Sequence, residues 1–288
     1  MTRIAGVLLY FRAGQDSLIE VINSCLLQSR EFDELIIVDN ASSDGVLSSI
    51  GPRFPGISLL FCESNEGYAA GMNRGFNGLS QTPDYCFFIT HEVIMQHNCV
   101  DSMVLRLDGG AVLVGPTLRL TDGKLWSKGG EISRLGKPRH AFNSTSRLSW
   151  LDGAVLGVDV GVFVALGCFD ERFFLYWEDV DLGYRMNRCG RVECASDTQA
   201  TQSTSLTPPY LRARGRVLMW RLHRRPLLLA SSLLELIAGA LAHLLMRPSQ
   251  ATFEELWLVL AGCKSGITES LNRGLATRRP NGKNRSNI

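Results

Sequence analysis

The chain has 288 residues, of which 45% are hydrophobic and 20% are charged, and its formal net charge is +2. This composition excludes a disordered chain and a polytopic membrane protein, and the near-neutral charge argues against a nucleic-acid partner. The eight cysteines are scattered singly and the first residues lack the pattern of a signal peptide, so we expect reduced thiols in a cytoplasmic protein.

Apolar runs of strand length alternate with helical spacing in the first ninety residues. We expect strands at 4–10, 34–38, 57–62 and 85–89, a helix at 17–28, and a second helix that begins within 65–73 and ends near 79. This alternation predicts a mostly parallel sheet flanked by helices, and such sheets bind ligands at the carboxyl ends of their strands. Polar clusters at Asp39, 65–73 and 90–92 all follow expected strands. The sequence therefore predicts a ligand site at that edge.

The second half is less regular. The expected elements are a strand at 111–114, a loop-rich polar stretch at 122–147, ordered segments at 150–154 and 158–165, a helix at 180–189, and helices beyond Pro208-Pro209. This division predicts an α/β domain at 1–207, a helical C-terminal region at 208–275, and a basic flexible tail at 276–288.

Residues 227–246 are long enough to span a bilayer. Their leucines favour insertion by about 4 to 5 kcal/mol, but one central acid and several polar residues cancel most of that gain. The polar and small residues Ser232, Glu235, Gly239 and His243 share one face at helical spacing, which indicates an amphipathic helix. Because arginines flank this segment, we expect the region to lie on the inner membrane face or to pair with a second copy.

Three segments carry a recognisable order of motifs. They are Ile-Ile-Val-Asp-Asn-Ala-Ser-Ser-Asp-Gly at 36–45, Asn-Glu-Gly-Tyr-Ala-Ala-Gly-Met-Asn at 65–73, and Phe-Asp-Glu-Arg-Phe-Phe-Leu-Tyr-Trp-Glu-Asp-Val-Asp-Leu at 169–182. From Ile4 to about Gly274 the chain resembles the inverting family 2 glycosyltransferases, and within them the bacterial rhamnosyltransferase-like branch. The resemblance implies a GT-A-type, Rossmann-like α/β fold with a C-terminal helical extension.

The same resemblance implies a function. The chain would move a sugar, rhamnose in the branch it most resembles, from a UDP- or dTDP-linked donor. The acceptor would be a glycan or a polyprenyl-diphosphate-linked sugar in cell-surface polysaccharide synthesis. Members of the family commonly use Mg²⁺ or Mn²⁺ to neutralise the leaving diphosphate.

The implied donor nucleotide site consists of Asp39, Asn40, Asp44, Gly67, Gly71 and Asn73. In the family, the aspartate that matches Asp39 accepts a hydrogen bond from the pyrimidine ring. The alternative is that Asp39 caps the following turn. Gly67 and Gly71 would let the backbone approach the nucleotide closely, and the alternative there is a tight turn and a helix start.

Thr90-His91-Glu92 stands where the family has its metal motif, whose third residue is usually aspartate. Glu92 can still coordinate a cation, and His91 suits Mn²⁺ better than Mg²⁺ or acts on the leaving phosphate as an imidazolium. A metal-free surface loop is the alternative. A second departure lies at 200–205, where relatives often have a histidine and this chain has none.

Asp179 is the expected general base, because inversion needs a carboxylate that takes the acceptor hydroxyl's proton. Neighbouring acids and aromatic rings are expected to raise its pKa. The alternative is that these acids only stabilise the first turn of a helix. The residues expected to contact the acceptor are Trp150, Asp152, Trp177 and Glu178, with Trp150 either stacked on a sugar or buried in the core.

Two rival functions remain open at this point. A non-catalytic homologue that binds a nucleotide or glycan would tolerate the altered 90–92 segment. A nucleotidyltransferase would need a glycine-rich, basic loop after the first strand, and Tyr-Phe-Arg-Ala-Gly at 10–14 is too sparse for that role.

Overall fold

The computed structural model describes residues 2–142, 148–203 and 207–270. A nine-stranded mixed sheet forms its centre, in the order β3-β2-β1-β4-β10-β6-β11-β5, with β7 paired to β6. The strands are β1 (Ile4–Tyr10), β2 (Glu34–Asp39), β3 (Ser58–Phe61), β4 (Tyr85–Thr90), β5 (Val93–Met95), β6 (Ala111–Leu120), β7 (Leu125–Ser127), β10 (Val155–Asp159) and β11 (Arg191–Gln202).

The first four strands pair in parallel, as the alternating pattern predicts. β10 runs antiparallel to both of its neighbours, β4 and β6. The reason is topological: β6 ends at the carboxyl edge of the sheet, and β10 begins at that same edge. The sheet is therefore mixed, and a long excursion of the chain lies beside the predicted ligand site.

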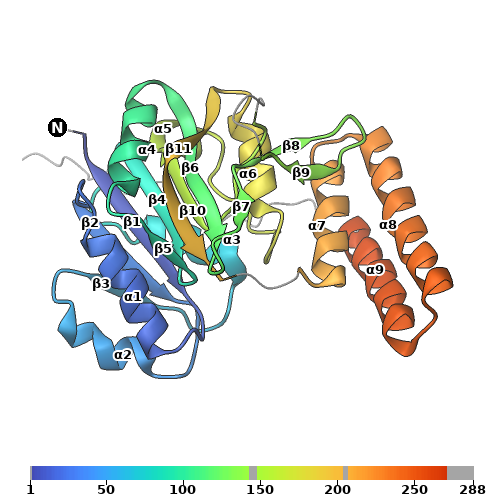
Figure 1. The fold of residues 1–288 in the computed structure, drawn as a ribbon, viewed down its shortest axis with the longest axis horizontal. Coiled ribbons are helices and arrows are strands. Elements are labelled where there is room, and N and C mark those ends of the chain that lie inside the picture. The colour runs from blue at the N-terminus through green and yellow to red at the C-terminus, as the bar shows by residue number, and fades with distance from the viewer. Residues whose placement is uncertain (1, 143–147, 204–206, 271–288) are drawn as a thin grey trace, which may run out of the picture.

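Helices cover both faces of the sheet (Figure 1). One face packs against α1 (Gln15–Leu26), α2 (Val46–Ile50) and α4 (Cys99–Asp108), and the other against α3 (Gly67–Asn77), α5 (Val160–Ala165) and α6 (Glu178–Met186). A 3₁₀ turn, η1 (Gly51–Arg53), follows α2. Alternation along β1 sends Leu8 and Tyr10 into the first core and Val7 and Leu9 into the second. The result is a three-layer sandwich.

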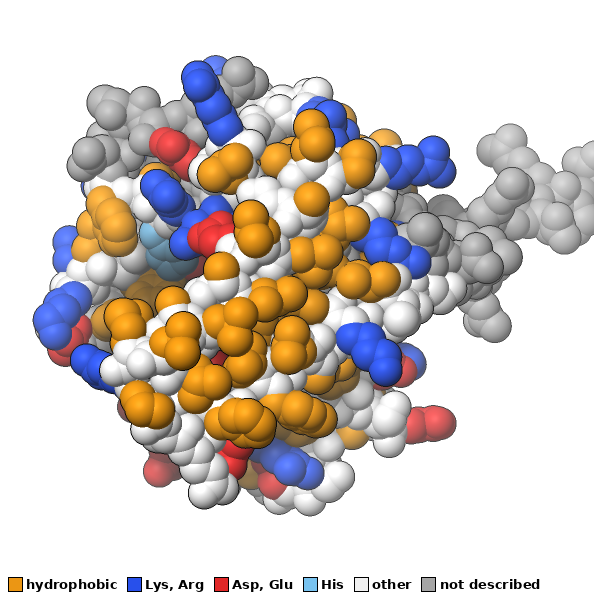
Figure 2. All heavy atoms as spheres, turned by 90° about the vertical axis from the view of Figure 1, so that its right-hand side faces the viewer, with side chains coloured by type: hydrophobic (Ala, Val, Ile, Leu, Met, Phe, Trp, Pro, Cys, Tyr) orange, Lys and Arg blue, Asp and Glu red, His pale blue; other side chains and the backbone are white. Residues whose placement is uncertain are grey.

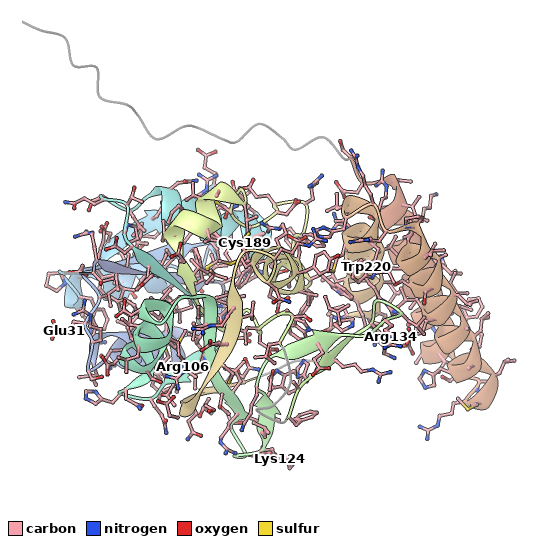
Figure 3. The ribbon with its side chains drawn as sticks, turned by 90° about the horizontal axis from the view of Figure 1, so that it is seen from above. Glu31, Arg106, Lys124, Arg134, Cys189 and Trp220 are labelled. Carbon is pink, nitrogen blue, oxygen red and sulfur yellow. The ribbon has the colours of Figure 1, made fainter. Side chains whose placement is uncertain are left out.

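The segment expected to be loop-rich contains β7 and a two-stranded hairpin, β8 (Gly130–Ile132) and β9 (Pro138–His140). The expectation of loops at 122–147 is therefore wrong for much of that stretch, while 143–147 lie outside the described residues. The hairpin reaches from the sheet to the C-terminal helices, with Arg134 and Trp220 near the junction (Figure 3). The indole Nε1 of Trp220 donates to the Gly136 carbonyl at 3.0 Å.

Three helices form the C-terminal region: α7 (Pro209–Leu222), α8 (Pro226–Met246) and α9 (Gln250–Thr268). They share a core of Ala213, Val217, Ala240, Val259 and Cys263. A Cβ on Gly262 would lie 2.4 Å from the Tyr210 carbonyl, so glycine allows α9 to approach α7 closely. The first helix begins one residue after the expected boundary, and the predicted tail at 276–288 lies outside the described residues.

Candidate functional site

Asp39 is the last residue of β2 and is 7% exposed. Its Oδ1 accepts a hydrogen bond from the Ser42 amide at 2.7 Å, so the side chain does cap the following turn. No residue of the described ranges donates a hydrogen bond to Oδ2. One oxygen therefore holds the loop, and the other is available to a ligand N–H.

Asn40 and Asp44 hold the loops around Asp39. Asn40 Nδ2 donates to Asn65 Oδ1 and to the Gly67 carbonyl, both at 3.0 Å, and its Oδ1 accepts from the Glu66 amide. Asp44 Oδ2 accepts from the Tyr10 hydroxyl at 2.6 Å. Both side chains are thus engaged with the protein and hold the loops around Asp39 in place.

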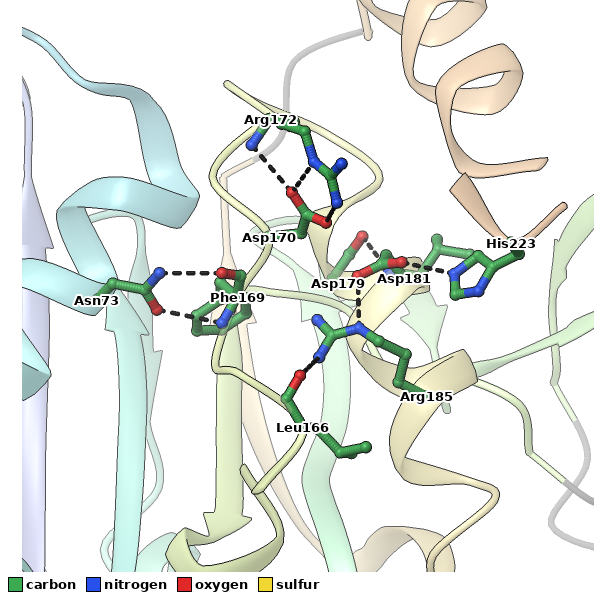
Figure 4. A network of polar contacts seen from close by, with 10 residues as sticks. Asn73, Leu166, Phe169, Asp170, Arg172, Asp179, Asp181, Arg185 and His223 are labelled. Atoms are coloured by element: carbon green, nitrogen blue, oxygen red, sulfur yellow. Dashed lines mark hydrogen bonds and ion pairs between the residues drawn. The ribbon is translucent and has the colours of Figure 1, made fainter. Parts of the chain in front are cut away.

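The glycines and the asparagine of α3 approach other protein segments rather than open space. A Cβ on Gly67, whose φ is +82°, would lie 2.0 Å from the Phe174 carbonyl, and one on Gly71 would lie 2.6 Å from Leu9 Cδ1. Asn73 exchanges hydrogen bonds of 3.0 and 3.1 Å with the backbone of Phe169 (Figure 4). The close approaches that we expected to serve the nucleotide pack α3 on the sheet and hold the segment that leads to Asp179.

A short segment, Gly153-Ala154, connects the three corners of the site. The Tyr68 hydroxyl donates to the Gly153 carbonyl at 2.6 Å, and the Gly153 amide donates to Asp179 Oδ2 at 3.1 Å. The Thr90 amide donates to the Ala154 carbonyl at 3.0 Å. The helix below the donor loop, the 90–92 segment and the candidate base are therefore linked through two adjacent residues.

Asp179 lies in the first turn of α6 and is half-buried. Its Oδ1 accepts from the Val180 amide at 2.7 Å, so two backbone donors fix the carboxylate. Burial, and then the charge of Asp152, raise the pKa of Asp179 to about 6. Tyr176 and Trp177 precede the helix with φ of 66° and 80°, a strained left-handed turn that concentrates at functional sites.

Two further acids beside Asp179 have an oxygen without a partner among the described residues. Glu178 is 4% exposed, and burial followed by the Asp179 charge raises its pKa well above the ordinary value. Asp152 Oδ1 accepts from Trp126 Nε1 at 3.2 Å. Glu178 Oε2 and Asp152 Oδ2 are buried and unpaired. Such atoms are uncommon, and a hydroxyl-bearing ligand can supply the missing donors.

The two tryptophans expected at the acceptor are core residues. Trp150 is 4% exposed, and an added Cβ on Gly130 would lie 2.2 Å from its ring atom Cε2, while one on Gly183 would lie 2.5 Å from its Cα. Trp177 is 7% exposed and packs on Gly215 of α7 in the same way. Neither ring face is free to stack on a sugar. Burial against glycines supports the alternative in which Trp150 belongs to the core. The sequence spacing does not reveal these contacts.

His91 and Glu92 follow β4 at the edge of the site. Since the Leu9 carbonyl accepts a hydrogen bond from His91 Nδ1 at 3.1 Å, that nitrogen carries the proton and Nε2 keeps its lone pair. Burial lowers the pKa of His91, which favours the neutral ring over an imidazolium. Nε2 lies 3.9 Å from Glu92 Oε1, and Glu92 is half-exposed.

This donor set fits a divalent cation that takes two protein ligands and completes its shell with substrate phosphate and water. A neutral imidazole favours Mn²⁺ over Mg²⁺. Within the described residues no group of three or more His, Cys, Asp or Glu side chains is placed to hold a metal on its own. The protein by itself therefore offers an incomplete site at this corner.

A histidine that sequence reasoning missed supports the helix of the candidate base. His223, at the end of α7, bonds Asp181 Oδ1 through Nε2 at 2.7 Å, and Arg185 Nε donates to Asp181 Oδ2 at 2.8 Å (Figure 4). Asp181 is 2% exposed, and Arg185 and His223 hold its pKa below the usual range despite burial. The C-terminal helices are thus fixed to α6 at a point two residues from Asp179.

Comparison with known proteins agrees with this geometry. A model of the family described as Glycosyl transferase family 2 matches residues 7–160. An N-acetylglucosaminyl-diphospho-decaprenol L-rhamnosyltransferase of Mycobacterium tuberculosis is 29% identical over 191 residues, which cover 54% of this chain and 61% of the relative. The chain therefore spans less than two thirds of the length of the curated relatives it matches.

Solved glycosyltransferase structures show the same GT-A fold. S. aureus TarS 1–349 aligns with a TM-score of 0.63 at 12% identity, covering 93% of this chain and 82% of that one. Its complex with UDP-GlcNAc aligns with a TM-score of 0.61 at 13% identity, covering 90% and 79%. GalNAc-T7 with UDP, GalNAc and Mn²⁺ aligns with a TM-score of 0.64 at 12% identity, covering 77% and 48%.

Proposed function

The chain belongs to glycosyl transferase family 2, and we propose that it transfers a sugar, with inversion, from a UDP- or dTDP-linked donor to a polyprenyl-diphosphate-linked or glycan acceptor. Rhamnose is the proposed sugar and cell-surface polysaccharide synthesis the proposed context. The mycobacterial relative, a rhamnosyltransferase of a decaprenyl-diphosphate-linked sugar by its name, supports the proposed sugar and a lipid-linked acceptor. The eight free cysteines and the expected membrane-side acceptor support a cytoplasmic, peripheral location.

The observation that carries this proposal is the Gly153-Ala154 connection. This segment links Asp179 to Tyr68 of α3 and to the 90–92 segment. The pKa of Asp179, about 6, leaves its carboxyl group ionised at neutral pH. Asp39 Oδ2 binds the base of the nucleotide, and Asp179 takes the proton of the attacking acceptor hydroxyl. The buried Glu178 and Asp152 oxygens accept hydrogen bonds from further hydroxyl groups of the acceptor.

A cation held by His91 Nε2 and Glu92 would neutralise charge that develops on the leaving diphosphate. The neutral state of His91 matters here, because a protonated ring would lose the lone pair that a metal needs. The Leu9 carbonyl accepts a hydrogen bond from His91 Nδ1 and so fixes the ring with its lone pair on Nε2.

The test is a panel of UDP- and dTDP-sugars incubated with the full chain, a polyprenyl-diphosphate-linked N-acetylglucosamine acceptor and Mn²⁺, with released nucleoside diphosphate measured. We expect release with one donor, dTDP-rhamnose first, and a dependence on acceptor. Tight nucleotide binding without turnover of any donor would instead support a non-catalytic homologue. That outcome would remove the proposed reaction.

A further inference from the structure

The outward face of the C-terminal region is apolar along its length. We call it the apolar face and define it by residues that are 43 to 83% exposed: Leu227, Leu234, Leu241, Leu245 and Met246 on α8, and Phe253, Trp257, Leu260 and Ile267 on α9. Hydrophobic side chains gather across this side of the molecule (Figure 2). α8 and α9 pack against each other, so the residues of the two helices form one surface.

The polar side of α8 faces the protein. Ser232 is fully buried and accepts a hydrogen bond from Arg216 Nε at 3.0 Å, and Glu235 pairs with Arg216 at 2.7 Å and with Lys137 at 2.5 Å. His243 bonds Glu255 of α9 at 2.7 Å. A helix on the surface of a soluble protein does the opposite and turns its polar side to water. The inward side of α8 thus carries these polar groups together with Leu229, Leu233, Leu236 and Ala240, while its outward side is apolar.

α8 is the one helix of the described ranges long and apolar enough to cross a membrane, which by itself is weak evidence. Its 21 residues give a length of about 31 Å. If α8 crossed the bilayer, the Glu235–Arg216 ion pair would either enter the hydrocarbon with it or break and leave Glu235 there unpaired. Both outcomes cost free energy. The anchors to α7, α9 and Lys137 hold the helix flat against the protein instead.

Cations stand at both ends of the apolar face. Arg224 and Arg225 precede α8 and Arg247 follows it, and all three are exposed without an ion pair to any described residue. Figure 2 shows basic side chains around the margin of the hydrophobic patch. Anionic headgroups complement such a margin. A second copy bound face to face would present the same arginines, and α8 and α9 offer one exposed acid, Glu254, to pair with the three of them.

We propose that the apolar face lies flat on a membrane surface that contains anionic lipids, with the outward side chains of α8 and α9 at headgroup depth and the three arginines on lipid phosphates. Membrane binding then holds the enzyme through the same helices that fix α6, by way of the Asp181–His223 contact. The proposal is independent of donor and acceptor identity, so a failed transfer assay and failed membrane binding are distinct results.

The test is co-sedimentation of the full chain with vesicles of phosphatidylcholine alone or with phosphatidylglycerol. We expect stronger binding to the anionic vesicles, weakened by salt. The variant Leu234→Glu/Leu245→Glu should lower the partition coefficient about tenfold or more, because it places charge in the bound face. Arg224→Gln/Arg225→Gln should lower binding to anionic vesicles by about fivefold per arginine and leave phosphatidylcholine binding unchanged.

The matched control is Leu27→Glu/Leu105→Glu, which alters two leucines of similar exposure, 68 and 62%, one directly after α1 and one on α4. This control should bind as the wild type does, and all variants keep the C-terminal tail unchanged. Equal losses of vesicle binding in Leu234→Glu/Leu245→Glu and in Leu27→Glu/Leu105→Glu would overturn the proposal. A wild-type chain that binds neither kind of vesicle would overturn it as well. So would a wild-type dimer in solution that Leu234→Glu/Leu245→Glu converts to a monomer, since a second copy would then cover the face.

Discussion

Replacing Asp179 by asparagine should lower kcat by about 10²- to 10⁴-fold, the usual contribution of a general base. Nucleotide affinity should change little, because the base lies on the acceptor side of the Gly153-Ala154 segment. Asparagine also turns an amide N–H₂ toward one of the two backbone donors at Gly153 and Val180. Circular dichroism and thermal unfolding must therefore show that the variant is folded.

The matched control for this variant is its neighbour, Glu178→Gln. Burial raises the pKa of the Glu178 carboxyl well above its ordinary value, which disfavours the charged form, and glutamine keeps the side-chain shape without a charge. We expect a loss of activity well below that of Asp179→Asn. An equal loss in the two variants would mean that no single carboxylate of this pair acts as the base.

The carboxyl group of Asp179 also determines the expected pH dependence of kcat/KM. The active form is the Asp179 carboxylate, whose pKa is raised to about 6. Activity should therefore rise about tenfold per pH unit below that value and become flat above it. Asp179→Asn should abolish this acid limb. A profile in which wild type and variant share the same limb would assign it to another group.

Removing divalent cations with EDTA should lower activity about 100-fold or more, since a metal contributes several kcal/mol at a leaving diphosphate. Mn²⁺ should restore activity better than Mg²⁺, because His91 presents a neutral nitrogen beside the Glu92 carboxylate. Glu92→Gln should raise the Mn²⁺ concentration needed for half-maximal activity by about tenfold or more.

Glu31→Gln serves as the control, since Glu31 is exposed and stands before β2, away from the 90–92 segment. Full activity in EDTA, with Glu92→Gln unchanged, would show that the chain handles the diphosphate without a metal. Donor binding can be measured by calorimetry at increasing Mn²⁺ concentrations. This measurement distinguishes a variant that has lost the metal site from one that has lost only the catalytic step.

The parallel half of the sheet was predictable because its signal is local. β1, β2, β3 and β4 fall within one residue of their expected bounds, since each is a short apolar run followed by polar residues. The middle was not predictable, because β7, β8 and β9 are three-residue strands whose pairing depends on the fold. α4 and the 12-residue β11 were missed as well, the latter because polar residues interrupt it.

The sequence predicted the residue types at the candidate site better than it predicted the role of each residue. Asp39 stands at the edge that the strand order indicated, whereas Asp179 was expected from its motif and was not placed by the strand order. The packing roles of Gly67, Gly71 and Asn73 depend on contacts with Phe174, Leu9 and Phe169, and each of these partners lies far away in sequence. His223 gave no signal, because its partner Asp181 precedes it by 42 residues.

The most direct test of the central claim is the anomeric configuration of the product, measured by proton NMR before the donor and product can equilibrate. A base at Asp179 that activates the acceptor opposite the leaving diphosphate predicts a glycosidic bond of configuration opposite to that of the donor. A product that retains the donor's configuration would contradict the account, because it would require a different chemistry at this site.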